Sequence, residues 1–255
     1  MLIDTHCHIH WADYPLNVDD VIKRANENGV HKMICVGTDE VTSKLAIEFA
    51  ASHTNIYATI GIHPHYADQG LENIEDLIKQ NLNSIVAIGE IGLDYFNNDI
   101  LHEDQKKLLR QQIELALKYN LPIIFHVREA FDDFWPIFDE FQSKSGGQIR
   151  GVLHSFIDTA ENLEKGLKRG LYVGVNGYST FTKDEAQKAM YKSIPISKMI
   201  LETDAPFLTP VPFRGKINEP AYVKNIAEYH GVVQGIGFDE ISAITSSNAR
   251  DLFNL

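Results

Sequence analysis

The sequence predicts a (β/α)8 barrel, or TIM barrel, in which all 255 residues form a single α/β domain. Short apolar runs of the kind that form buried parallel strands begin eight times along the chain. Neighbouring starts lie between 21 and 37 residues apart, which leaves room for a strand, a helix and two short loops each time. The length also matches the roughly 250 residues that this fold requires. Repeat and length together favour a closed barrel over an open doubly wound sheet.

The expected strands alternate along the chain with stretches of helical periodicity. They begin near Leu2, Lys32, Ile56, Ile85, Pro122, Arg150, Leu171 and Lys198. The clearest helix covers 103–119, where leucine, isoleucine and alanine recur at three- and four-residue spacing. Right-handed crossovers through such helices produce a parallel sheet. After the last strand we expect a glycine-rich loop at 231–237 and a closing pair of helices at 238–255.

Composition and charge limit the classes of function. The net charge of −12 is unfavourable for a protein that grips long duplex DNA, because that binding depends on lysine and arginine releasing counterions. If the substrate is a nucleic acid, we therefore expect the protein to bind its end or a short segment of it. Two cysteines, Cys7 and Cys35, cannot build a disulfide framework. With neither a signal-peptide pattern nor an apolar run near roughly 18 residues, the sequence predicts a cytoplasmic protein without a membrane or an obligate protein partner.

Metal-ligand side chains follow the expected strands in a recurring way, as an apolar run followed at once by histidine or a carboxylate. His6 and His8 lie two residues apart and share one face of the first strand, while Cys7 points to the other face. Because the carboxyl ends of barrel strands meet at one mouth, we expect such side chains to gather there. Imidazoles and carboxylates together bind divalent metals such as zinc. The expected ligands are His6, His8, Glu90, His126, His154 and Asp204.

The number of ligands predicts two divalent metal ions per subunit, because six ligands exceed the four that a tetrahedral zinc ion takes. The two histidines of the first strand would hold one ion together with Asp204. His126 and His154 would hold the other. Glu90 has two carboxylate oxygens and would bridge the two ions. Four imidazoles favour zinc, manganese or nickel over magnesium, although a weakly held second ion could be magnesium or manganese.

Three carboxylates are candidates for catalytic roles. Glu90 and Asp204 would stand beside the metal-activated water. Glu202 lies two residues before Asp204 and shares its face. Glu202 would accept a proton, or it would contact a metal ligand from the side away from the metal. The alternative for Glu202 is a buried ion pair with a lysine or arginine of the barrel.

Seven segments also resemble a known family. They are IDTHCH (3–8), GIHPH (61–65), GEIGLDY (89–95), LHSF (153–156), ETDAP (202–206), PVPFRGK (210–216) and NEP (218–220). In this order along nearly the whole chain they resemble the TatD family of metal-dependent deoxyribonucleases, in the branch that keeps the N-terminal His-x-His pair. The resemblance implies a barrel of the amidohydrolase superfamily that uses two divalent ions to hydrolyse phosphodiester bonds in DNA.

The resemblance also implies the same six metal ligands, and it adds residues that face the substrate. The added substrate-binding candidates are His63, Arg128, Arg214 and Lys216. The histidine, with Glu202, would face the scissile phosphate or the water, and the three cations would hold phosphate. Phe213 departs from the family, whose members often carry histidine or tyrosine there, so no polar contact is expected from it.

The predicted function is an exonuclease-type deoxyribonuclease of the TatD kind, acting on DNA ends or single strands through a metal-activated water. One alternative is hydrolysis of another ester or amide bond at the same two-metal site, as in a lactonase or a D-aminoacyl-tRNA deacylase. The metal ligands alone do not distinguish the nuclease from this alternative, because metal-activated water can attack a phosphodiester as well as another ester or an amide. The other alternative is a binding protein without catalysis that the metals only stabilise.

The remaining aromatic and imidazole side chains have plainer interpretations. Trp11 and Trp135 are interpreted as packing residues, with base stacking at the rim as the alternative. His65 lines the mouth or belongs to a loop. Surface or helix-end positions are expected for His10, His31, His53, His102 and His230.

Overall fold

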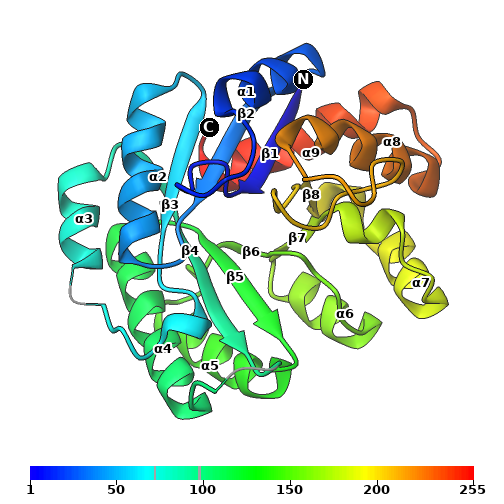
Figure 1. The fold of residues 1–255 in the computed structure, drawn as a ribbon. Helices are drawn as coiled ribbons and strands as arrows, with labels where there is room; N and C mark the ends of the chain where they lie inside the picture. Colours follow the sequence, from blue (N-terminus) through cyan, green and yellow to red (C-terminus); the bar gives the residue numbers. More distant parts are fainter. Residues whose placement is uncertain (72, 97–98) are drawn as a thin grey trace.

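The computed structural model describes residues 1–71, 73–96 and 99–255, and it confirms the predicted barrel. Within these residues, eight parallel strands are hydrogen-bonded in the order β1 to β8, with helices around them (Figure 1). The strands are β1 (Leu2–Cys7), β2 (Val30–Val36), β3 (Ile56–Ile60), β4 (Ile85–Asp94), β5 (Ile123–Arg128), β6 (Gly151–Leu153), β7 (Tyr172–Val175) and β8 (Met199–Leu201). Each begins within two residues of its expected start.

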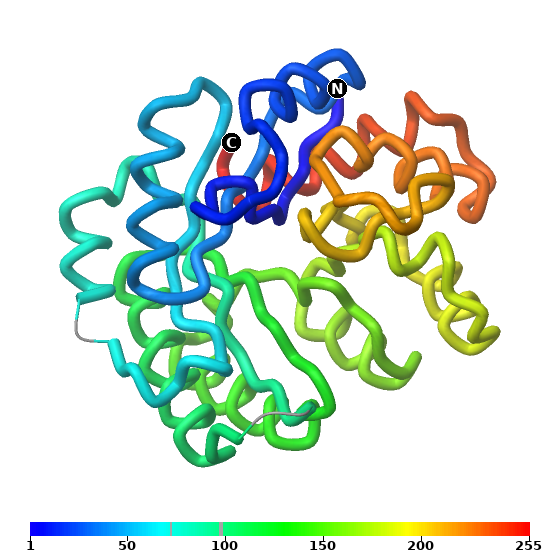
Figure 2. Tube along the Cα trace, in the orientation of Figure 1, coloured from blue at the N-terminus to red at the C-terminus, as the bar shows by residue number. Residues whose placement is uncertain are grey.

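The chain passes around the barrel in sequence order, as the colours of Figure 2 show. The helices are α1 (Val18–Glu27), α2 (Glu40–Ser52), α3 (Ile74–Asn81), α4 (His102–Tyr119), α5 (Phe131–Lys144), α6 (Ala160–Lys168), α7 (Glu185–Ser193), α8 (Val223–Gln234) and α9 (Phe238–Phe253). Short 3-10 turns are η1 (Pro64–Tyr66), η2 (Gly177–Thr180), η3 (Ile196–Lys198) and η4 (Pro220–Tyr222). None of the helices in the described parts is long and apolar enough to cross a membrane.

The barrel closes at residues that were predicted to bind metal. The backbone N–H of Asp204 donates to the carbonyl of His6 at 2.8 Å, and the N–H of His8 donates to the carbonyl of Ala205 at 2.8 Å. An isolated bridge pairs Cys7 with Ala205. These bonds hold the end of β1 beside the segment after β8, so the first and last predicted ligands become neighbours.

Helix α9 covers the opposite, amino-terminal end of the barrel. Its residues Leu252 and Phe253 join an apolar cluster with inward-facing strand residues such as Ile34. Asn248 Nδ2 donates to the carbonyl of Met199, the first residue of β8, at 2.8 Å. With this end packed shut, the carboxyl ends of the strands are left for a site.

Three expectations were wrong. The segment 231–237 is not a loop throughout, because α8 continues to Gln234. The tail is one helix, α9, rather than a pair. Of the histidines expected at surface or helix-end positions, His10 and His230 are buried. His230 lies inside α8, where its Nε2 is 2.8 Å from Ser179 Oγ, so a buried partner compensates for its polarity.

Candidate metal centre

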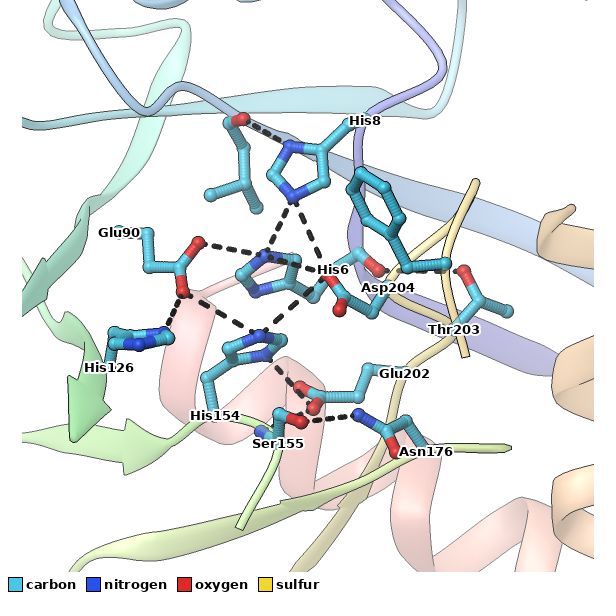
Figure 3. A network of polar contacts seen from close by, with 12 residues as sticks. His6, His8, Glu90, His126, His154, Ser155, Asn176, Glu202, Thr203 and Asp204 are labelled. Carbon is cyan, nitrogen blue, oxygen red and sulfur yellow. Dashed lines mark hydrogen bonds and ion pairs between the residues drawn. The ribbon is translucent and has the colours of Figure 1, made fainter. Parts of the chain in front are cut away.

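The six predicted ligands converge on one point at the carboxyl end of the barrel. Figure 3 shows their side chains pointing toward one another from β1, β4, β5 and the segments after β6 and β8. His6 and Glu90 are almost completely removed from solvent, and Asp204 keeps a side chain that is 16 % exposed. The centre is thus buried but open to the cleft at Asp204 and at His126, whose side chain is 20 % exposed.

Three donor atoms lie around His6 Nε2 at distances typical of neighbouring ligands of one ion. His6 Nε2 lies 3.3 Å from His8 Nε2, 3.4 Å from Glu90 Oε2 and 3.7 Å from Asp204 Oδ1. The Asp204 oxygen is 3.5 Å from His8 Nε2. Ligands about 2.1 Å from a tetrahedral zinc ion lie about 3.4 Å from each other. Two imidazoles and two carboxylates at this spacing fit a divalent cation.

The second oxygen of Glu90 faces two further histidines. Oε1 lies 3.7 Å from His154 Nε2 and 2.6 Å from His126 Nδ1. The shorter contact is a hydrogen bond, so a cation held there would take the place of the shared proton. Because one carboxylate points an oxygen at each group of imidazoles, the geometry fits a bridging role for Glu90.

Three of the four histidines predicted as ligands have an acceptor within 2.9 Å of the ring nitrogen that faces away from the centre. His8 Nδ1 lies 2.8 Å from the carbonyl of Val36. His126 Nε2 lies 2.8 Å from Asp94 Oδ2, and His154 Nδ1 lies 2.9 Å from Glu202 Oε1. Such contacts fix the tautomer and turn the other nitrogen to a metal. This pattern supports a metal site rather than a cluster of core histidines.

Glu202 lies behind His154 rather than in the open part of the site. It is only 1 % exposed, and its Oε1 accepts a hydrogen bond of 2.6 Å from the backbone of Ser155. Asn176 Nδ2 in turn donates to Ser155 Oγ at 2.7 Å (Figure 3). The partner of Glu202 is therefore a histidine, not the lysine or arginine considered as the alternative.

Asn176 and Ser155 were not among the predicted site residues, and Asp94 appeared only within the GEIGLDY motif. Asn176 follows β7 directly, so it continues the pattern of a polar residue after an apolar run. Asp94 ends β4. Both therefore carry the same signal as the ligands, but Asn176 is an amide rather than a histidine or carboxylate, and Asp94 lies four residues beyond the predicted ligand Glu90 on the same strand.

Charge pairing shifts the pKa values within the centre. Burial disfavours the ionised forms of Glu90 and Asp204, but the surrounding histidines outweigh it and lower the pKa of both carboxyl groups. Burial also disfavours protonated His126, yet hydrogen bonds with Asp94 and Glu90 raise its pKa to about 9. For His154, the charges of Glu202 and Glu90 overcome burial and raise the pKa to about 10. The centre therefore holds protons where metals would bind.

Two more histidines stand at the edge of the centre. His63 Nε2 lies 3.9 Å from Glu90 Oε1, and burial followed by repulsion from His126 lowers its pKa to about 3. His65 Nε2 lies 3.1 Å from Asp94 Oδ2. Both line the open cleft, so of the two roles considered for His65, the mouth and a loop, the structure supports the mouth.

The cleft over the centre has a volume of about 870 Å³. Among the predicted substrate residues, His63 and Arg128 line it, but Arg214 and Lys216 do not. The Arg214 guanidinium lies 3.6 Å from the ring centre of Phe181 and donates to the carbonyl of Thr209 at 2.8 Å. The two outer cations thus stay predictions without support from the cleft geometry.

The other aromatic candidates are also placed. Phe213 stacks on Tyr222 with ring centres 4.3 Å apart. It is thus a packing residue, in agreement with the expectation that it makes no polar contact. Trp135 is buried in α5, which confirms packing. Trp11 lines the cleft.

A parallel eight-stranded barrel whose strand ends converge on buried histidines and carboxylates has the architecture of a metal-dependent hydrolase. Comparison with known proteins agrees: residues 3–254 match the family described as TatD related DNase. The chain therefore belongs to this family and is a metal-dependent hydrolase.

Individual relatives cover the chain almost completely. It is 39 % identical to the metal-dependent hydrolase YabD of Bacillus subtilis, over 100 % of both chains. It is 34 % identical to the 3′-5′ ssDNA/RNA exonuclease TatD of Erwinia tasmaniensis, over 93 % of both chains. The crystal structure of a TatD homologue from Escherichia coli superimposes with a TM-score of 0.89 at 29 % identity, covering 100 % of this chain and 98 % of that one.

Proposed function

We propose that this protein uses two divalent metal ions to cleave phosphodiester bonds at the 3′ ends of single-stranded DNA. The observation that carries the proposal is the position of Glu90, whose two oxygens face two separate groups of imidazoles at the floor of an open cleft. The direction of cleavage follows relatives of 31–34 % identity that are named 3′-5′ ssDNA/RNA exonucleases.

The ligands divide between the ions as their distances suggest. His6, His8 and Asp204 would hold one ion with Glu90 Oε2. The second would lie between Glu90 Oε1 and the remaining two ligands, His126 and His154. Imidazole donors favour zinc, manganese or nickel, and magnesium suits only a weakly held second ion. Bound ions of this kind lower the pKa of water and neutralise charge on a phosphate.

Side chains around the ions bind the substrate and move the proton. Asp204 lines the cleft after β8, and its lowered pKa keeps it ionised, so its free oxygen would accept the proton of the attacking water. Arg128 and His63 line the cleft and would contact the phosphate. Glu202 would act by orienting His154 rather than by touching substrate.

An assay with defined metals tests the proposal. Chelator-treated protein is reloaded with Zn²⁺, Mn²⁺, Ni²⁺ or Mg²⁺ and incubated with 5′-labelled single-stranded DNA, the matching duplex, an aryl ester and a lactone. We expect shortening of the single strand from its 3′ end. His126→Ala should slow it by more than about 100-fold, beyond what losing an outer partner of a ligand costs. His31→Ala, at an exposed position, is the matched control.

Hydrolysis of the ester or lactone without any cleavage of DNA would overturn the proposal in favour of the alternative bond. Equal DNA cleavage by wild type and His126→Ala would also overturn it, because the activity would then not depend on this centre.

A further inference from the structure

Three large apolar side chains are exposed at the rim of the cleft, and Phe207 is more exposed than the other two, Ile157 and Tyr66. Phe207 is 51 % exposed, lines the cleft and lies three residues after Asp204. Its backbone N–H donates to the Asp204 carbonyl at 2.8 Å. Exposure of a phenyl ring to water is unfavourable, so its place beside the metal centre calls for an explanation.

The backbone that carries this ring is held rigidly. Asn218 is completely buried, and its Nδ2 donates to the carbonyls of Thr203 (2.8 Å) and Phe207. Its own N–H donates to the carbonyl of Pro206 at 3.1 Å. Tyr14 Oη donates to the Asn218 carbonyl at 3.0 Å and ties the segment after β1 to the same point. The ring is thus presented to solvent from a fixed backbone, as a preorganised contact would be.

Trp11 links the ring to the metal centre. Its indole packs edge-to-face with Phe207, with ring centres 6.0 Å apart. It also stacks on His8, with ring centres 4.3 Å apart and planes 26° apart. Phe207 is therefore two ring contacts from a predicted metal ligand. A group stacked on it would be adjacent to a bond held at the ions.

The charges of the cleft point to the kind of group. Arg128 is the single lysine or arginine among the described residues that line it, and its guanidinium lies 3.7 Å from the ring centre of Phe96. Glu129 and Asp158 also line it. Beyond the ions themselves the lining offers little positive charge, so further affinity for a nucleic acid of any sequence depends on uncharged contacts. Stacking of bases on aromatic side chains is such a contact, because every base has a flat face.

Resting on the proposed function, we propose that Phe207, backed by Trp11, is a stacking platform for a base that flanks the bond being cleaved. A base has to leave the duplex stack to reach it. The platform therefore selects single-stranded ends at the step of substrate binding.

The test compares two single-stranded oligonucleotides that differ only at the 3′ end. One carries normal bases throughout, and the other has abasic residues at its last two positions. The wild type should cleave the normal end with a kcat/KM about 5- to 150-fold higher, the range that stacking of one base gives. Phe207→Ala should lose this advantage on the normal end and remain within about twofold of wild type on the abasic end.

Two further substitutions separate stacking from general apolarity. Phe207→Trp keeps an aromatic face and should retain the preference for normal ends, whereas Phe207→Leu keeps an apolar side chain and should lose it. Phe238→Ala removes a phenyl ring that is also exposed but lies outside the cleft, and it should behave as wild type. An effect expressed mainly in KM would match a binding platform.

The inference is overturned if the wild type cleaves both ends equally well, or if Phe207→Ala slows both by the same factor. These results leave cleavage by the wild type intact, so the proposed function would survive them. Absence of cleavage of either oligonucleotide by wild type with every metal would overturn the proposed function, and this inference with it.

Discussion

At the level of single residues, the carboxylates behind the histidines are as informative as the ligands themselves. Asp94 faces His126, and Glu202 faces His154, each at the ring nitrogen that points away from the centre. A carboxylate there holds the imidazole in one orientation and makes its other nitrogen a stronger donor. Metal affinity should therefore depend on residues that never touch the metal.

Asp94→Asn tests this dependence. The amide keeps the size of the side chain but loses its charge, so we expect the affinity for the ion that His126 would hold to fall about 10- to 100-fold. Competition with a chromophoric chelator measures the affinity directly. Asp158→Asn, the same substitution elsewhere in the cleft, is the control and should change little. Unchanged affinity in Asp94→Asn would show that the contact with His126 is not needed.

Protons held by His126 and His154 should leave when metal binds. Their pKa values of about 9 and about 10 keep both rings protonated at pH 7 in chelator-treated protein. Because a metal binds the deprotonated ring, loading should release about two protons per chain at pH 7. Activity should also fall in acid, where protons compete more strongly for the ligands. Calorimetric titration in buffers of different protonation enthalpy measures the release, and heats independent of the buffer would contradict it.

At the level of elements, β7 contributes a position without a side chain, Gly174. Gly174 lies opposite the Glu202 side chain, and a Cβ on Gly174 would come within 2.5 Å of a Glu202 carboxylate oxygen. Only glycine leaves room for this buried carboxylate between β7 and His154. The close approach of the strand's backbone thus positions Glu202, and through it the predicted ligand His154.

Gly174→Ala should therefore destabilise the protein by about 1–3 kcal/mol, the usual cost of forcing an atom into a packed interior. It should also weaken metal binding, because Glu202 would move relative to His154. Gly237→Ala is the matched control, since a Cβ there meets nothing within 4 Å. Denaturant unfolding and chelator competition measure both effects. A variant as stable as the control would show that the carboxylate can move without cost.

The positions of strands and helices could be predicted where a periodic apolar pattern marks the element and a polar residue marks its end. They could not be predicted where the only guide was local composition. The eight strands and α4 were found because their apolar residues face a packed surface. The glycines at 231–237 misled the prediction: Gly231 is buried within α8, where a small side chain lets the chain pack closely against Ile236 and Ile241. Such packing is set by tertiary contacts that local propensity does not contain.

At the level of the whole molecule, the protons of the centre should make stability depend on pH. His126 and His154 have pKa values raised above about 6.5, the value expected in the unfolded chain. Burial, only partly opposed by Thr203, likewise raises the pKa of Asp4 to about 8. Above about pH 7 the folded state therefore binds more protons than the unfolded state, and stability falls as pH rises.

We expect the Tm of chelator-treated protein to fall between pH 7 and pH 10, as Asp4 and then the two histidines lose their protons. Protein loaded with metal, with the excess removed, should show a smaller fall, because the metals replace the histidine protons. Thermal unfolding followed by circular dichroism at several pH values checks both curves. Parallel curves for the two forms would refute the assignment of these protons to the centre.

The sequence by itself determined the fold class, the strand order and the residues that gather at the metal centre. This was possible because strand ends of a barrel meet at one mouth, so position along the chain predicts position in space. Alternation along β1 likewise placed His6 and His8 together and Cys7 in the packing.

Only the tertiary structure decided which of those residues face the cleft and which support other side chains. It placed Glu202 behind His154, left Arg214 outside the cleft, and brought Phe207 and Trp11 to the rim. These are relations between side chains on loops and strands far apart in the sequence. They depend on how the barrel closes and on which polar groups find partners, and no periodicity along the chain encodes them.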